Sequence, residues 1–117
     1  MVNNDLISKF SNIIDVNEET FMSEVVEVSK TKPVIVDFWA PWCEPCKTLT
    51  PLLEDAVKGY GQELILAKID IDQNQNIAAQ LSIKSIPTIY TFFEGKVVDG
   101  FQGAKSNKEI IEFVTKS

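Results

Sequence analysis

Two cysteines, Cys43 and Cys46, are the residues whose type and spacing could do chemistry, and the chain has no others. Two cysteines three positions apart at the start of a helix can bring their sulfur atoms close enough to form a disulfide. A thiol at a helix N-terminus also faces unpaired backbone N–H groups and the positive end of the helix dipole, which favour the reactive thiolate. The pair therefore predicts thiol–disulfide exchange, in which Cys43 attacks a substrate disulfide and Cys46 resolves the mixed disulfide.

Other interpretations of the pair stay open, namely two structural thiols or half of a metal site. Two thiolates cannot complete the tetrahedral site that zinc prefers, so we expect no metal within one chain. A zinc or iron–sulfur centre shared between two chains is the remaining metal alternative. The sequence has no histidine, which removes Ser-His-Asp and Cys-His catalysis.

Length and composition are those of one globular domain. The chain has 117 residues, of which 44% are hydrophobic, and we expect a single domain over 1–117 with a loose lead-in over 1–10. No apolar run is long enough for a transmembrane helix, so no membrane partner is expected. A net charge of −6 disfavours nucleic acid as a partner. The first ten residues lack the apolar stretch of a secretory signal, so we expect a cytoplasmic protein. A monomer is the default expectation for its oligomeric state.

The elements that must position the cysteines alternate between strand and helix. Hydrophobic patterns predict strands over 13–16, 34–39, 64–69, 88–93 and 96–98, and helices over 18–29, 43–58, 74–81 and from 106 onward. The order β-α-β-α-β-α-β-β-α predicts an α/β fold, a central mixed β-sheet flanked by helices on both faces. Cys43 directly follows the buried strand 34–39 and opens a helix, which is the context that favours a redox role.

Several turn and cap residues mark where these elements begin and end. Asn17 can cap the first helix, and Glu94-Gly95 is typical of a hairpin turn. Ser106 and Glu109 form a capping-box pattern at the start of the last helix. Pro51 lies inside the helix that follows the cysteines and predicts a kink there.

The stretch 39–47, Trp-Ala-Pro-Trp-Cys-Glu-Pro-Cys-Lys, resembles the active-site segment of thioredoxins. The resemblance continues in order through several segments and covers about residues 13–115. It implies the thioredoxin fold and reduction of disulfides in client proteins. It also implies that no cofactor is bound: the working group is a redox-active disulfide, and its electrons come from NADPH via thioredoxin reductase.

Two charged residues match family positions beneath the cysteines. Asp37 matches the buried aspartate below the second cysteine, which implies a proton acceptor for Cys46, acting through water, with a carboxyl pKa raised by burial. The alternative is a polar group with its bonds satisfied in the core. Lys68 matches the lysine near that aspartate and would tune it; a solvated lysine at the strand end is the alternative.

The segment Ile86-Pro87 matches the family's cis-proline opposite the disulfide. The resemblance implies that Ile86 offers its backbone to a bound substrate strand, whereas from the residues alone Pro87 could open a strand in trans. Trp42, Ile86 and the Gly103-Ala104 loop would then form an apolar patch around Cys43.

The sequence departs from the family pattern between the two cysteines. Glu44 stands where thioredoxins usually have glycine, and Pro45 follows it. We expect both residues to tune the pair. An acidic group beside Cys43 opposes the helix dipole and should raise the thiol pKa, although solvent screening keeps the effect modest.

Two stretches, 48–54 and 97–104, are similar to the thioredoxin-like N-terminal domain of chaperedoxins. That resemblance implies an alternative function: holding unfolding client proteins, protecting their cysteines by mixed disulfide, and working with chaperones as further partners. The intact cysteine pair favours turnover, because Cys46 can resolve a trapped client. Disulfide reduction is therefore the preferred prediction.

Overall fold

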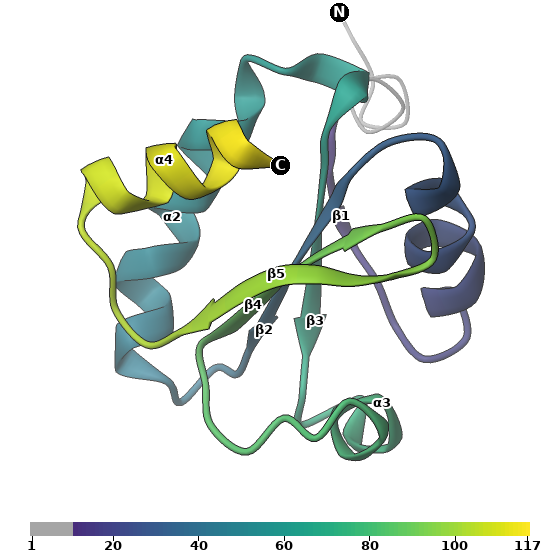
Figure 1. The fold of residues 1–117 in the computed structure, drawn as a ribbon. Helices are drawn as coiled ribbons and strands as arrows, with labels where there is room; N and C mark the ends of the chain where they lie inside the picture. Colours follow the sequence, from purple (N-terminus) through teal and green to yellow (C-terminus); the bar gives the residue numbers. More distant parts are fainter. Residues whose placement is uncertain (1–10) are drawn as a thin grey trace, which may run out of the picture.

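The computed structural model describes residues 11–117 (Figure 1), so the predicted lead-in over 1–10 lies outside the described residues. The elements follow one another as β1 (Ile13–Asp15), η1 (Met22–Val26), η2 (Val28–Lys30), β2 (Val34–Trp39), α2 (Glu44–Lys58), η3 (Gly61–Glu63), β3 (Ile65–Asp70), α3 (Gln75–Gln80), β4 (Thr88–Phe93), β5 (Lys96–Gln102) and α4 (Asn107–Lys116). The predicted alternation of strands and helices is confirmed. Within residues 11–117, no helix is long and apolar enough to cross a bilayer.

The strands form one mixed sheet in the order β1-β3-β2-β4-β5. β3 pairs in parallel with both β1 and β2, while β4 is antiparallel to β2 and to β5. The parallel strands β2 and β3 therefore finish at the same end of the sheet, and β4 starts at that end. The loop that follows β2 and the loop that precedes β4 are thus brought together by the strand register.

Helical segments cover both faces of the sheet, with η1, η2 and α3 on one side and α2 and α4 on the other (Figure 1). Side chains of β2 alternate between the two layers. Val34, Val36 and Phe38 pack with the η1 layer, and Ile35 packs with α2 and α4. Asp37 lies on the same face of β2 as Ile35. Its carboxyl group is therefore buried in the layer between the sheet and helices α2 and α4, where the neighbouring buried residues are hydrophobic.

The helix predicted over 18–29 is wrong in type. A turn follows Asn17, whose Oδ1 accepts hydrogen bonds from the backbone N–H groups of Glu19 and Thr20, and the helical part is a π-helical turn followed by a 3-10 turn. Three β-branched valines in residues 25–28 lower the α-helical propensity of this segment.

The remaining differences concern the second half of the chain. β5 extends to Gln102, well beyond the predicted strand 96–98, because backbone pairing with β4 continues along an edge strand whose side chains are mostly exposed. Glu94 and Gly95 both have positive φ, as a tight hairpin turn requires. The capping box at Ser106 is confirmed. α2 continues through Pro51, and the kink there stays a prediction.

Candidate active site

A disulfide joins Cys43 and Cys46 at the beginning of α2. Cys43 is the N-cap residue, and its Sγ accepts a hydrogen bond from the backbone N–H of Cys46 at 3.3 Å. The backbone N–H of Cys43 donates to the carbonyl of Ala40 at 3.1 Å, which turns the chain sharply between β2 and α2. Both cysteines are buried in this form, so the two differ in position along the helix and not in exposure.

Asp37 is fully buried on the side of β2 that faces α2. Thr50 Oγ1 of α2 donates a hydrogen bond of 2.7 Å to Asp37 Oδ2, and Oδ1 has no partner among residues 11–117. Burial raises the pKa of Asp37 to about 6, against the lowering effects of the Thr50 hydrogen bond and of the Lys68 charge. Within residues 11–117, one oxygen of this core carboxyl is therefore hydrogen-bonded and the other is not.

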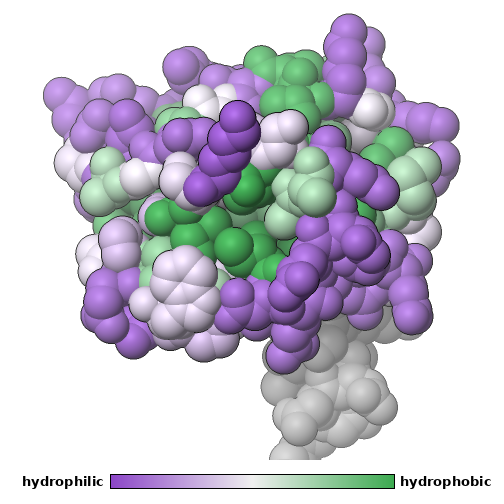
Figure 2. Space-filling model, turned by 90° about the horizontal axis from the view of Figure 1, so that it is seen from below, coloured by the Kyte–Doolittle hydropathy of each residue, from purple (hydrophilic) through white to green (hydrophobic). Residues whose placement is uncertain are grey.

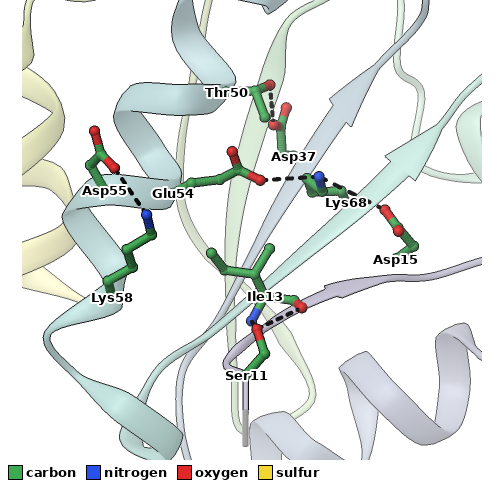
Figure 3. A network of polar contacts seen from close by, with 9 residues as sticks. All are labelled: Ser11, Ile13, Asp15, Asp37, Thr50, Glu54, Asp55, Lys58 and Lys68. Carbon is green, nitrogen blue, oxygen red and sulfur yellow. Dashed lines mark hydrogen bonds and ion pairs between the residues drawn. The ribbon is translucent and has the colours of Figure 1, made fainter. Parts of the chain in front are cut away.

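Lys68 of β3 is the register partner of Asp37 on β2. Its ammonium lies 3.1 Å from Glu54 Oε2 and 4.0 Å from Asp15 Oδ1, and its side chain is only 22% exposed. Figure 3 shows Asp37, Thr50, Glu54 and Lys68 pointing toward one another between α2 and the sheet. The lysine is therefore part of a half-buried charged network and not a solvated strand-end residue.

A cavity of about 290 Å³ lies beside the second cysteine, and Cys46, Thr50 and Lys68 contribute to its lining. It has room for several water molecules at roughly 30 Å³ each. Sequence reasoning missed Thr50 and Glu54. The signal was present, because Cys46, Thr50 and Glu54 are spaced by four along α2 and so lie on one helix face.

The peptide bond between Ile86 and Pro87 is cis, so the prediction from the resemblance is confirmed and the trans alternative is wrong. Thr88, the next residue, is the register partner of Phe38 near the end of β2. The proline therefore lies at the end of the sheet where the cysteine loop begins. Gly103 has φ +81°, and its N–H donates to the Pro87 carbonyl at 2.9 Å. The end of β5 is thereby tied to the proline.

Trp42, directly before Cys43, is 64% exposed. Its indole Nε1 donates to Asp72 Oδ2 at 2.9 Å, a contact from the loop after β3 that the sequence did not predict. Figure 2 views the end of the molecule that carries these loops and shows hydrophobic residues gathered in its middle, surrounded by hydrophilic ones. Ile86 is half-buried at this end.

The two residues between the cysteines point to solvent. Glu44 and Pro45 are both exposed in the first turn of α2, where a proline is favourable because its missing N–H would have had no helical partner. Glu44 Oε1 lies 2.9 Å from Lys47 Nζ, so the acidic charge beside Cys43 has a basic neighbour. No cluster of three or more potential metal ligands occurs in the part of the chain that the structure describes.

Comparison with known proteins gives one consistent family. The family model described as Thioredoxin matches residues 12–116. The thioredoxin of Acidithiobacillus ferridurans is 40% identical over 102 residues, covering 87% of this chain and 93% of the relative. The Bacillus subtilis thioredoxin is 38% identical, covering 89% and 96%, and the chloroplastic M-type thioredoxin of Chlamydomonas reinhardtii is 40% identical, covering 86% and 71%. The narrower resemblance to chaperedoxins is not shown by these relatives and stays a prediction.

Proposed function

This chain belongs to the thioredoxin family and is a thiol–disulfide oxidoreductase that reduces protein disulfides, and we propose that Cys43 is its nucleophile, Cys46 its resolving thiol and Asp37 its proton acceptor. The observation that carries the proposal is the position of the disulfide. It closes the first turn of α2, and the same helix contacts the buried Asp37 through Thr50.

In the first step, the Cys43 thiolate attacks one sulfur of a substrate disulfide. The substrate S–S bond breaks, a mixed disulfide forms, and the second substrate sulfur leaves as a thiolate that takes a proton from solvent. The N-cap position of Cys43 supports this role, because the helix dipole and the Cys46 N–H both stabilise negative charge on its sulfur.

In the second step, Cys46 gives up its proton and attacks Cys43 Sγ. The mixed disulfide breaks, the substrate leaves as a dithiol with two electrons gained, and the Cys43–Cys46 disulfide remains. Asp37 receives the proton through water beside Cys46, where the cavity is lined by Thr50, the hydrogen-bond partner of Asp37. Its Oδ1, which has no partner within residues 11–117, is the acceptor. A base with a pKa of about 6 is ionised near neutral pH, as this step requires. Lys68 tunes that base through its charge.

Substrate chains bind at the end of the sheet where the cysteine loop follows β2. The exposed Trp42 and the half-buried Ile86 supply apolar contact, and the cis peptide at Pro87 with the Gly103 turn shapes the surface beside them. Every group in the proposed cycle comes from one chain, which is consistent with a monomer.

The oxidised pair is then reduced again by thioredoxin reductase with electrons from NADPH. Client proteins that contain disulfides are the other partners. Because the cycle needs a continuous supply of reductant, we propose that the protein works in the reducing cytoplasm.

Reduction of insulin disulfides, coupled to thioredoxin reductase and followed by loss of NADPH, tests the cycle. We expect rapid NADPH loss that disappears in Cys43→Ser, and slower resolution near neutral pH in Asp37→Asn. An unchanged rate in Asp37→Asn would remove the proton-acceptor role. A wild-type protein that consumes no NADPH, although dithiothreitol reduces its disulfide, would point to the chaperone-linked holding function instead.

A further inference from the structure

We propose that Thr50 is a positioning residue for disulfide reduction: its hydroxyl fixes the Asp37 carboxyl so that Oδ1 is left for the Cys46 proton, and so sets the pH range in which Cys46 resolves mixed disulfides. The inference rests on the proton-acceptor role of Asp37 proposed above. It assigns a function to an uncharged residue of α2.

The geometry comes from the spacing along α2. Thr50 lies one helical turn after Cys46 on the same face of the helix, and both residues contribute to one cavity. From that position the Thr50 hydroxyl makes a short hydrogen bond of 2.7 Å to Asp37 Oδ2. This bond occupies one carboxyl oxygen and restrains rotation of the group. The other oxygen, Oδ1, has no partner within residues 11–117 and remains available as an acceptor.

Within residues 11–117, no second donor competes with the Thr50 hydroxyl for the Asp37 carboxyl. The neighbour of Asp37 on β3 is Lys68. The Lys68 ammonium lies 3.1 Å from Glu54 of α2 and 4.0 Å from Asp15 of β1. On β4 the register partner of Asp37 is the apolar Ile89. Thr50 is thus the one hydrogen-bond donor to the carboxyl within residues 11–117.

The direction of the effect follows from the chemistry of the bond. A hydroxyl that donates to a carboxylate stabilises the ionised form, and in a buried site this stabilisation is large. Removal of the hydroxyl therefore leaves Asp37 protonated to higher pH. Since only the ionised carboxylate can accept the Cys46 proton, resolution would then require more alkaline solution.

The first experiment measures Asp37 directly, by following its ¹³C-labelled carboxyl signal against pH in the oxidised protein, in which neither cysteine titrates. In Thr50→Val the midpoint should rise by about one pH unit, the size expected for loss of a charge-assisted hydrogen bond. Thr50→Ser keeps the hydroxyl and should restore the wild-type midpoint. Thr91→Val is the matched control, because Thr91 is a buried threonine of β4 whose hydroxyl has no partner within residues 11–117. An unmoved midpoint in Thr50→Val overturns the inference.

The second experiment follows resolution itself. Reduced protein is mixed with dithiobis-nitrobenzoate, and the slower release of the second nitrothiobenzoate reports attack by Cys46 on the mixed disulfide. Its pH profile should move upward in Thr50→Val by the same amount as the carboxyl midpoint, and return in Thr50→Ser. If Asp37→Asn slows this phase but Thr50→Val leaves its pH profile in place, the inference fails while the proposed cycle stands. If Asp37→Asn has no effect, the proton-acceptor role fails, and the inference fails with it.

Discussion

Asp37 and Lys68 are register partners on adjacent strands, yet the Lys68 ammonium makes its ion pair with Glu54 of α2, at 3.1 Å. The lysine therefore acts on the aspartate through its charge and not through a bond. The two members of the ion pair have opposite effects on Asp37, because the Lys68 charge lowers the pKa of Asp37 and the Glu54 charge raises it.

The first prediction follows from these opposite signs. Lys68→Gln should raise the pKa of Asp37, since the neighbouring positive charge is lost. Glu54→Gln should lower it, since the neighbouring negative charge is lost. Carboxyl titration of the oxidised protein by NMR would measure both. Shifts in the same direction would mean that the substitutions act by rearranging the network and not by charge.

The second prediction concerns stability against pH. The folded-state pKa of Asp37, about 6, lies above the ordinary aspartate pKa of 3.8 because the carboxyl is buried. The contribution of this group to the free energy of unfolding is thus fully present below the pKa of the unfolded state and is lost as the pH rises through about 6. Asp37→Asn removes the cost of an ionised buried group. At about pH 8 it should raise the free energy of unfolding by roughly 2 to 3 kcal/mol.

Urea unfolding of the oxidised proteins checks this prediction. The advantage of Asp37→Asn should vanish at about pH 2.5, more than one unit below the ordinary pKa of the group, where the aspartate is largely neutral in both the folded and unfolded states. A constant difference between wild type and variant across this range would show that the substitution changes packing, and that titration of Asp37 contributes nothing to stability.

Much of the fold was predictable because its signals are local. The buried strand 34–39 is apolar except at Asp37, and Ser106 with Glu109 marks the start of α4 from four residues alone. The edge strand β5 gave a weaker signal, since its side chains are mostly exposed and backbone pairing with β4 determines its length. The first helical segment was mispredicted because its apolar spacing suits a helix, while its valines disfavour the α form.

The candidate site likewise contains residues that a local sequence pattern identifies and residues that it does not. The cysteines and Asp37 stood out by residue type, since a carboxyl group inside an apolar strand is unusual. Thr50 and Glu54 are ordinary residues for a helix surface, and only the pairing of that surface with Asp37 and Lys68 gives them a role. The contact between Trp42 and Asp72 joins two loops, and no local pattern predicts such a contact.

The third prediction separates the two cysteines. Cys43→Ser should abolish turnover and give no mixed disulfide, because the N-cap thiolate is lost. Cys46→Ser should accumulate a stable mixed disulfide with an insulin chain, because the nucleophile remains while the resolving thiol is gone. Non-reducing electrophoresis and mass spectrometry would detect the adduct. An adduct in Cys43→Ser, with none in Cys46→Ser, would reverse the assigned roles.

The fourth prediction concerns the acidic residue between the cysteines. The Glu44 carboxylate is adjacent to Cys43 in sequence, so its charge should disfavour the thiolate and raise the thiol pKa. Lys47, whose ammonium lies 2.9 Å from that carboxylate, should act in the opposite direction. Both side chains are largely exposed, and exposed charges are strongly screened. We therefore expect Glu44→Gln to favour the Cys43 thiolate only slightly and Lys47→Gln to disfavour it to a similar extent.

Titration of the thiolate ultraviolet absorbance in the reduced protein measures both shifts. Glu44→Gln is preferred to Glu44→Gly, because glycine would also loosen the first turn of α2 and mix a backbone effect with the charge effect. High salt should bring both variants back toward the wild-type midpoint, since screening shortens the range of each charge. Shifts that persist in high salt would mean that the side chains act by shaping the helix start. In that case Glu44 tunes the pair through conformation, and Glu44→Gly should change the Cys43 midpoint more than Glu44→Gln does.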